Sequence, residues 1–596
     1  MCGIAGLIDS TGKINKKNLE NILLTQNSRG PENNNIKQLD EYVFFGHNRL
    51  KIIDLRDEAN QPLESGSGKY TIVFNGEIYN FKEIKKQLLD YNFKTFSDTE
   101  VILASLELKG LDWFLDIANG MFSFAIHDKN NKSVILCRDR SGVKPLYYFF
   151  DGKTLLFASN PKSIYDQKNL NISIDKSAIS EYLSYRYVRT PKSFFSKVCQ
   201  IIPGSYMTID YSKKNIKTSL KKYYSLPKFL KSDYSIQTEI ELESTVHDLL
   251  FSSVKKRLVA DVKVGSFLSG GVDSSLIAAM AATMQGNNLS TYTVGTKTNN
   301  EFRYANEIAK IYKTDHHEII YTKDDYFNEW PDLIKSKGGP LGVPNEVPLS
   351  LMTRALSDDI TVVLSGEGAD ELFGGYGRIF RLPEHASPKQ FHKAFFDKYE
   401  YMNSKEQSEL GLPQIGLINQ DLQNKLIDKQ LSPQEFIFYY FQKYHIEGLL
   451  QRLDTSTMRW SIEAREPFLD KDLINFVYSK VPISLKLKWI GNAKKIVKEK
   501  GLIPKNYSET LDIPKYLLKK VAERYLPKEI IYRKKEGFPI ELMSWHNEMI
   551  DIFKSHYKNQ DILRFNKNEL NSFLENKNNS QKIWMINNVF MFLKNV

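Results

Sequence analysis

The stretch Val264-Gly265-Ser266-Phe267-Leu268-Ser269-Gly270-Gly271-Val272-Asp273-Ser274-Ser275 decides how the second half of this chain folds. It lies between an apolar run typical of a buried strand, at 262–268, and an Ala-rich helical pattern at 273–284. Glycines let a backbone approach an anion closely, and N–H groups at a helix start can hold phosphate oxygens together with nearby hydroxyls. The residues placed to do so are Ser269, Gly270, Gly271, Ser274 and Ser275. The stretch therefore predicts a phosphate-binding turn; a Ser/Gly turn that only caps a helix is the alternative.

The chemistry of this turn follows from what surrounds the glycines. The chain lacks the G-x-x-x-x-G-K-[ST] pattern of a Walker loop. Asp273 would by itself repel phosphate, an arrangement that makes sense if Mg²⁺ lies between the two. A loop that grips the terminal pyrophosphate of ATP leaves the α-phosphate open to attack. The pattern therefore favours transfer of AMP over transfer of the γ-phosphoryl group.

A second strand–turn–helix follows the same logic in Thr361-Val362-Val363-Leu364-Ser365-Gly366-Glu367-Gly368-Ala369-Asp370-Glu371. Its small and acidic residues come at the carboxyl end of a predicted strand, where open α/β sheets bind ligands. The carboxylates of Glu367, Asp370 and Glu371 fall within five residues. A surface cluster explains this poorly beside a Ser-Gly pair, and the pattern predicts metal or substrate binding.

Around these turns, strand and helix patterns alternate from about residue 240, which predicts a parallel α/β sheet. The first 210 residues instead show short apolar runs separated by turn signals, typical of antiparallel sheets, with helical patterns near 16–26 and 80–91. Residues 213–239 are polar and rich in Lys, Ser and Tyr, and we interpret them as a linker. Residues 386–596 read as mainly helical.

Length and composition are those of a multidomain globular protein. At 596 residues the chain exceeds the ~250–300-residue limit of a single core. Its distant cysteines, Cys2, Cys137 and Cys199, do not suggest a disulfide framework and fit a reducing, cytoplasmic location. No signal-peptide pattern and no run of ~18 apolar residues occur, so we expect no membrane span. The net charge of +11 comes from scattered lysines, so we expect no nucleic-acid partner.

Cys2, in the run Met1-Cys2-Gly3-Ile4-Ala5-Gly6, becomes the first residue if Met1 is removed. One residue would then carry a thiol nucleophile and a free α-amine that titrates near pH ~8 and can act as its base. A lone cysteine at this position is more often idle, so motifs elsewhere in the chain must decide its role.

The first half carries a series of short motifs: Ser28-Arg29-Gly30-Pro31-Glu32, 46–54, Gln61-Pro62-Leu63, Asn75-Gly76-Glu77-Ile78-Tyr79-Asn80, Ser97-Asp98-Thr99-Glu100, Asn119-Gly120-Met121-Phe122, and Arg138-Asp139-Arg140 with Lys144-Pro145-Leu146-Tyr147. In these motifs, and in their order, the chain resembles the glutamine-dependent asparagine synthetases of the B type. The resemblance implies a class II glutamine amidotransferase domain at 2–212, with the αββα N-terminal-nucleophile fold, a linker at 213–239 and a synthetase domain at 240–596.

The resemblance also implies a role for each residue of a glutamine site. Cys2 would attack the side-chain amide of glutamine, and Asn75 and Gly76 would form the oxyanion hole that stabilises the tetrahedral intermediate. Arg49 would hold the α-carboxylate with its guanidinium fork. The full set of glutamine-binding residues would be Arg49, Ile52, Ile53, Asn75, Gly76, Glu77 and Asp98, of which Glu77 and Asp98 hold the α-ammonium.

The second half resembles the ATP-pyrophosphatase domain of these synthetases in the two turns, in Glu463-Ala464-Arg465-Glu466-Pro467-Phe468-Leu469-Asp470, and in the motif from Pro527 to Phe538. The overall class is therefore α/β and α+β in two domains, the second a parallel-sheet α/β domain with a helical C-terminal region. By resemblance, Glu367 takes part in forming and capturing an acyl-adenylate, and Mg²⁺ binds Asp273 and Asp370. ATP and pyrophosphate would contact Phe267, Ser269, Gly270, Gly271, Asp273, Ser274, Ser275, Val294, Ser365, Gly366 and Lys515.

The chain departs from the family pattern in a few places. Ser28 stands where a His is frequent and Glu32 where an Asp is, and both changes should be mild. Gly338-Gly339-Pro340 replaces the Asp-Glu-Pro of many relatives in a segment, 338–346, that lies near the acceptor pocket in the family. The identity of the acceptor acid therefore depends on this segment.

Together these features predict an enzyme that makes asparagine from aspartate, glutamine and Mg·ATP through β-aspartyl-AMP, as a homodimer by family expectation. The nearest alternative is the same chemistry on another carboxylate, such as a sugar uronate in surface-polysaccharide assembly. An intact Cys2 argues against a β-lactam synthetase, which needs no ammonia. A non-catalytic glutamine or nucleotide sensor is the alternative from another class.

Overall fold

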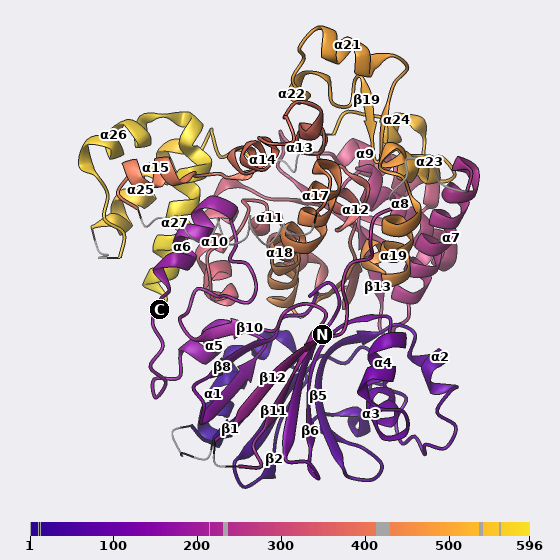
Figure 1. The fold of residues 1–596 in the computed structure, drawn as a ribbon, viewed down its shortest axis with the longest axis vertical. Coiled ribbons are helices and arrows are strands. Elements are labelled where there is room, and N and C mark those ends of the chain that lie inside the picture. Colours follow the sequence, from indigo (N-terminus) through magenta and orange to yellow (C-terminus); the bar gives the residue numbers. More distant parts are fainter. Residues whose placement is uncertain are drawn as a thin grey trace.

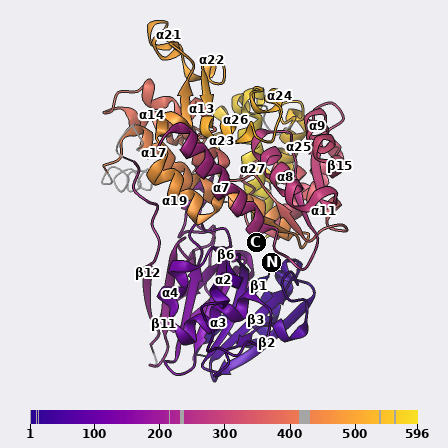
Figure 2. The same ribbon diagram turned by 90° about the vertical axis from the view of Figure 1, so that its right-hand side faces the viewer.

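The computed structural model describes residues 2–9, 11, 14–213, 215–230, 237–412, 430–535, 540–558 and 562–596. The N-terminal half, indigo to purple in Figure 1, lies against one side of the larger C-terminal half. Figure 2 shows the same division from the side, with the sheets of the first half below the helices of the second. Met1 and residues 536–538 of the motif that ends at Phe538 lie outside the described residues.

Two antiparallel sheets form the first half (Figure 1). The first contains, in spatial order, β10 (Val198–Gln200), β8 (Tyr147–Phe150), β9 (Thr154–Ala158), β1 (Gly3–Asp9), β3 (Val43–Arg49) and β2 (Asn33–Asp40). The second contains β12 (Lys217–Lys222), β11 (Ser205–Asp210), β7 (Ser133–Arg138), β6 (Gly120–Asp128), β5 (Tyr70–Ile78) and β4 (Leu63–Glu64). Apolar side chains from both sheets, among them Ile4, Phe45, Val73 and Leu136, share one core. The alternation of apolar residues in these strands places that core between the sheets.

Helices cover the outer faces of this sandwich. Leu19 and Leu23 of α1 (Lys16–Thr25) pack with residues of the first sheet. The other helices that cover it are α2 (Phe81–Lys85), α3 (Asp98–Leu108), α4 (Leu111–Ile117) and α5 (Pro161–Tyr165). α6 (Lys176–Tyr185) packs instead against the second half, beside α27 (Ser580–Lys594) (Figure 1). α2, α3 and α4 share a core with the second sheet. The predicted αββα fold is confirmed.

Two local predictions differ from the structure. The helix expected at 80–91 ends at Lys85, because the following turns bury Leu88 and Tyr91 in the core of the second sheet. The stretch interpreted as a linker contains β12, which pairs with β11 and extends the second sheet. All residues of β12 are exposed, so no apolar alternation marks it in the sequence.

A parallel sheet lies in the second half. Its strands are, in spatial order, β15 (Asp315–Ile320), β14 (Ser290–Gly295), β13 (Val264–Phe267), β16 (Val362–Leu364) and β17 (Glu463–Arg465). The chain runs outward from β13 to β15 and then returns to β16 and β17 on the other side of β13. The order therefore reverses between β13 and β16, the place where open parallel sheets bind ligands at the carboxyl ends of their strands. The predicted parallel α/β sheet is confirmed.

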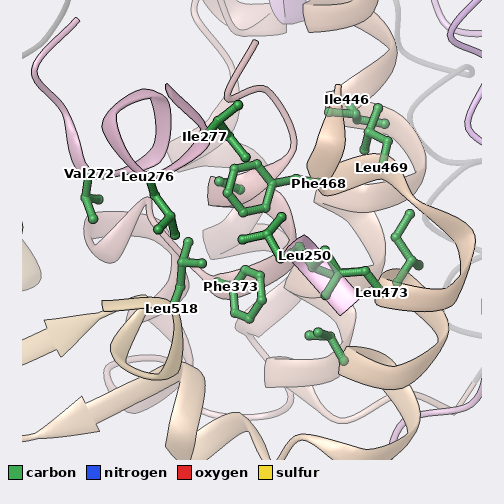
Figure 3. Packing of buried hydrophobic residues seen from close by; sticks show 14 of the residues in the cluster. Leu250, Val272, Leu276, Ile277, Phe373, Ile446, Phe468, Leu469, Leu473 and Leu518 are labelled. Carbon is green, nitrogen blue, oxygen red and sulfur yellow. The ribbon is translucent and has the colours of Figure 1, made fainter. Parts of the chain in front are cut away.

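The helices that accompany this sheet are α7 (Glu239–Arg257), α8 (Val272–Gln285), α9 (Phe302–Tyr312), α10 (Lys323–Lys337), α11 (Glu346–Leu356) and α12 (Ala369–Phe373). Figure 3 shows how Leu276 of α8 and Phe373 of α12 meet Leu250 of α7 and Phe468 in one core. Burying such side chains stabilises the fold by about 1.5–3 kcal/mol each. This core holds the first turns of α8 and α12 in place, and those turns carry the predicted site residues.

The C-terminal region is mainly helical, as predicted. It contains α13 (Gly377–Phe380), α14 (Phe391–Tyr399), α15 (Ser404–Glu409), α17 (Pro433–Tyr440), α18 (Ile446–Met458), α19 (Lys471–Lys480), α20 (Ile483–Lys486), α21 (Ala493–Glu499), α22 (Pro504–Tyr507), α23 (Tyr516–Ala522), α24 (Lys528–Ile531), α25 (His546–Tyr557), α26 (Lys567–Glu575) and α27 (Ser580–Lys594). The antiparallel pair β18 (Leu487–Trp489) and β19 (Asp512–Pro514) leads directly to Lys515. No helix within the described ranges has the length and apolar character needed to cross a membrane.

Candidate functional site

Cys2 lies at the start of β1, buried beside Asn75 of β5. Its backbone N–H donates to Asn75 Oδ1 at 3.1 Å, and its Sγ lies 4.0 Å from the carbonyl oxygen of Leu50. Burial raises the pKa of the Cys2 thiol, so forming the thiolate needs a base. The Asn75 Nδ2 group is buried and has no hydrogen-bond partner among the described residues. A free donor beside the thiol is what an oxyanion hole requires.

Gly76 allows β5 to pass close to β6 beside the thiol. Its φ of +151° belongs to the region that favours glycine, and a β-carbon there would lie 2.1 Å from the carbonyl oxygen of Met121. Any side chain would therefore push the strand away and move Asn75 with it.

Arg49, the predicted partner of a glutamine carboxylate, is buried at the end of β3. It donates to the carbonyl oxygen of Arg56 at 2.7 Å, to Asn60 Oδ1 at 2.7 Å and to the carbonyl oxygen of Asp54. These acceptors are neutral, and burial lowers the pKa of Arg49 although nearby acidic groups such as Asp54 oppose the shift. Such a guanidinium is suited to receive an anion.

The predicted ammonium ligands sit in a cluster of buried charges to which both halves contribute. Asp98 Oδ2 accepts from the backbone N–H of Ile78 at 2.8 Å, and Glu77 Oε1 lies 3.5 Å from a terminal guanidinium nitrogen of Arg465. Arg465 Nε in turn donates to Glu463 Oε1 at 2.6 Å. Burial, with Glu463 nearby, raises the pKa of Asp98 to about 7. Burial and Glu463 likewise raise the pKa of Glu77 well above its ordinary value.

Sequence reasoning assigned no role to Glu463 and Arg465, although both lie in a motif that it singled out. Both are fully buried on β17, the edge strand of the parallel sheet that reaches the first half. Ile52, predicted to complete the glutamine pocket through its backbone, also meets the second half, since its carbonyl oxygen accepts from the N–H of Asp261 at 2.9 Å. Ile53 is half-buried beside it.

Arg29 joins Cys2 to the second half. Its Nε donates to the carbonyl oxygen of Cys2 at 3.2 Å, and its terminal nitrogens form a two-point ion pair with Asp454 of α18 at 2.7 and 3.2 Å. Both side chains are about nine-tenths buried. The nucleophile is thus tied to a helix that also reaches the second site.

The second site is a cleft at the reversal point between β13 and β16. Its cavity volume is about 280 Å³, close to the lower end of the ~300–1,000 Å³ typical of ligand pockets. The predicted residues that line it are Phe267, Ser269, Gly271, Asp273, Ser274, Val294, Ser365, Gly366, Glu367, Asp370 and Lys515. Gly270 and Ser275 do not line it, and the Ser275 hydroxyl is buried without a hydrogen-bond partner among the described residues.

The phosphate turn has the local structure that the sequence predicts. α8 begins after Gly271, which offers no side chain to cap the first N–H groups of the helix. Those N–H groups are left for an anion. The hydroxyls of Ser269 and Ser274 lie 2.9 Å apart and hold the turn closed.

One lysine bridges the acidic residues of the two turns. Lys515 Nζ lies 2.7 Å from Asp273 and 3.0 Å from Asp370, and Lys535 Nζ lies 2.6 Å from the other Asp370 oxygen. Although burial would raise the pKa of Asp370, these two lysines hold it well below its usual value. The same carboxylates hold the pKa of Lys515 above its usual value despite burial. Asp273 and Asp370 supply hard carboxylate oxygens from facing turns, the donor set that Mg²⁺ prefers.

Glu367 faces Arg452, which sequence reasoning missed. Arg452 comes from α18, forms an ion pair with Glu367 and lies 3.3 Å from Asn345 Oδ1. Burial raises the pKa of Glu367, and the positive charge of Arg452 opposes that rise. Arg452 lies outside every motif quoted above, so no sequence signal pointed to it.

The segment expected near the acceptor pocket lies elsewhere for most of its length. A β-carbon on Gly338 would meet Lys162 and Asn160, and one on Gly339 would meet Phe194, all in the first half. Asn345 is the residue of 338–346 that lines the cleft. The unusual Gly338-Gly339-Pro340 is therefore packed against the first half instead of the acceptor.

Known proteins resemble this chain along its whole length. The family model for asparagine synthase matches residues 245–594, and the model for a glutamine amidotransferase domain matches residues 1–224. Glutamine-hydrolysing asparagine synthetase 1 of Bacillus subtilis (strain 168) is 31% identical over 640 residues, which cover 98% of this chain and 95% of the relative. The third such synthetase of the same organism is 28% identical over 621 residues, again covering 98% of this chain and 95% of the relative.

Proposed function

Because the chain belongs to the asparagine synthase family, we propose that it transfers the amide nitrogen of glutamine to the β-carboxylate of aspartate and cleaves ATP to AMP and pyrophosphate. One observation carries the proposal: two candidate sites occur in one chain. The first is a buried thiol beside the unpaired Asn75 amide, and the second is a cleft with charged groups suited to a nucleotide at the sheet reversal. The ion pair of Arg29 and Asp454 joins the elements that carry them.

At the first site, Cys2 attacks the carboxamide carbon of glutamine. The Nδ2 group of Asn75 donates to the oxyanion that forms, in a buried place where such a hydrogen bond is strong. Arg49 binds the α-carboxylate, and Asp98 and Glu77 bind the α-ammonium. Ammonia leaves as the thioester forms, and water releases glutamate from Cys2.

At the second site, the turn from Ser269 to Ser274 holds the pyrophosphate part of ATP, and Phe267 and Val294 flank the nucleoside. Asp273 and Asp370 would hold Mg²⁺, which would supply positive charge to the phosphate oxygens. Lys515 neutralises the charge that develops as the β-carboxylate attacks the α-phosphate, a role that its place between two carboxylates suits. Glu367, next to this position, assists the attack of ammonia on β-aspartyl-AMP.

Ammonia crosses from one site to the other through the interface of the two halves. One continuous apolar cluster contains Leu50, Met121 and Val143 of the first half together with Leu268 and Leu469 of the second. An apolar surround favours neutral ammonia over ammonium and keeps water from the adenylate.

The proposal is tested by the release of pyrophosphate with Mg·ATP and ammonium, as aspartate and then sugar uronates are supplied. We expect release that depends on aspartate and an amide product with the mass of asparagine. Pyrophosphate release with a uronate but not with aspartate would show that the uronate is the acceptor. No release with any acid would favour a non-catalytic sensor.

The pH dependence of glutamine use tests Asp98. Its carboxyl, with a pKa of about 7, is ionised above pH 7 and neutral below, so the ammonium of glutamine loses its partner in acid. With the α-amine of Cys2 titrating near ~8 and the pKa of Glu77 also raised, log kcat/KM for glutamine should fall with a slope of at least about 2 below pH 7. In Asp98→Asn the slope should be lower by about 1 and the KM higher. An unchanged slope would contradict the role; Asp112→Asn, on the surface of α4, is the control.

Other features of the proposal come from the resemblance. They are the division near residues 212 and 240, Mg²⁺ as the metal, a homodimer and a cytoplasmic location. Light scattering at several concentrations tests the homodimer directly.

A further inference from the structure

The positive groups of the cleft are unevenly placed. Those at the phosphate turn are Lys515 and Lys535, which pair with Asp370; Arg533, which donates to the Gly270 carbonyl at 3.2 Å; and Lys519, whose pKa is lowered to about 8 by burial and by Lys515. Phosphates of the nucleotide account for positive charge at that end of the cleft.

Arg452 extends from α18 into the wall of the cleft, where it pairs with Glu367 and donates to Asn345 Oδ1. Its side chain is about nine-tenths buried, and its Nε–H is buried without a hydrogen-bond partner among the described residues. An unpaired guanidinium donor in such a place costs free energy unless a ligand takes it. The two terminal nitrogens of Arg452 bond to Glu367 and Asn345, so the Nε–H is the donor left for a carboxylate.

The acceptor brings a charge that needs such a partner. When the β-carboxylate of aspartate attacks ATP, the α-carboxylate stays ionised and would be buried next to Glu367. A buried carboxylate without a cation is strongly disfavoured. Arg452, Glu367 and Asn345 line the same cleft as the phosphate turn, so an acid bound to Arg452 would lie beside the nucleotide.

On the basis of the proposed function, we propose that Arg452, oriented by Asn345, binds the carboxylate of the acceptor that is not activated. Arg452 is thereby a specificity-determining residue: it selects a dicarboxylic amino acid over an otherwise similar monocarboxylic one. Because Arg452 pairs with Glu367, an acid bound to Arg452 would lie next to Glu367, the residue proposed to assist amide formation.

The test compares aspartate with β-alanine, which has the same carboxylate to activate but no α-carboxylate. With ammonium as nitrogen donor, the wild type should prefer aspartate in kcat/KM for pyrophosphate release. In Arg452→Gln the ratio of the two kcat/KM values should fall about 30-fold, chiefly through the KM for aspartate. In Arg452→Lys this ratio should fall less, because lysine keeps the positive charge but lacks the guanidinium geometry. Arg459→Gln, on the same helix but paired with Glu329 and Asp332 outside the cleft, is the matched control.

Each result has one meaning. If Arg452 only positions Glu367, both acceptors lose activity equally and the ratio stays constant, which overturns this inference and leaves the proposed function intact. If the wild type releases no pyrophosphate with aspartate, the proposed function fails and the inference with it. Glutamine hydrolysis reports whether each variant folds. If Arg452→Gln shows no glutamine hydrolysis, the aspartate to β-alanine ratio of kcat/KM in Arg452→Lys and Asn345→Ala tests the inference instead.

Discussion

Cys2→Ala should abolish glutamine hydrolysis and leave asparagine synthesis from ammonium almost unchanged. Removing a catalytic nucleophile lowers kcat by as much as about 10⁶-fold, and no other thiol lies at this site. Cys199 lies on β10 of the first sheet, and Cys137 of β7 is buried in the core that the second sheet shares with its helices. The cleft proposed to bind ATP is lined by residues of the second half, so the loss should not reach it.

The measurement pairs glutamate release from glutamine with pyrophosphate release driven by ammonium. Cys199→Ala removes a half-buried thiol elsewhere in the same half and should leave both rates near those of the wild type. Equal loss of both activities in Cys2→Ala, with normal folding, would contradict a model of two separate sites. Retained glutamine hydrolysis would show that another group is the nucleophile.

Asp273→Ala should have the opposite effect: no pyrophosphate release with either nitrogen donor, and preserved glutamine hydrolysis. Asp273 is the acid that the phosphate turn contributes, and it faces Lys515 at 2.7 Å. Its loss would remove a proposed ligand for Mg²⁺ and leave Lys515 with Asp370 alone. Metal ions contribute several kcal/mol to reactions of this kind, so a fall of at least about 10³-fold is expected, or ~4 kcal/mol in activation free energy.

A matched control separates this role from helix stabilisation. Asp273 lies in the first turn of α8, where any acid favours the helix through its dipole. Asp324 lies in the first turn of α10 and is exposed, so Asp324→Ala removes the dipole contribution without touching the cleft. The metal role would be refuted if Asp273→Ala still released pyrophosphate at a normal rate, or if its response to Mg²⁺ concentration matched that of the wild type.

Much of the site could be predicted because its parts are local. A strand, a glycine-rich turn and a helix start are encoded in a dozen consecutive residues, and the turn from Ser269 to Ser274 has the structure they imply. The prediction that Ser275 lines the site is wrong, because its position one residue further along the helix turns its hydroxyl into the core. β12 shows another, because an edge strand with both faces exposed carries no apolar pattern.

What the sequence determined by itself is the set of reactive groups at each candidate site: the thiol, the phosphate turn and the acids that follow β16 belong to continuous segments whose local structure follows from nearby residues. What only the tertiary structure decided is how these segments share charges. Arg452 reaches Glu367 across 85 positions, Arg29 reaches Asp454 across 425, and β17 brings Glu463 and Arg465 to the glutamine site. The physical reason is that buried charges must find partners in space, and the pairing of residues far apart in sequence is set by how the two halves pack.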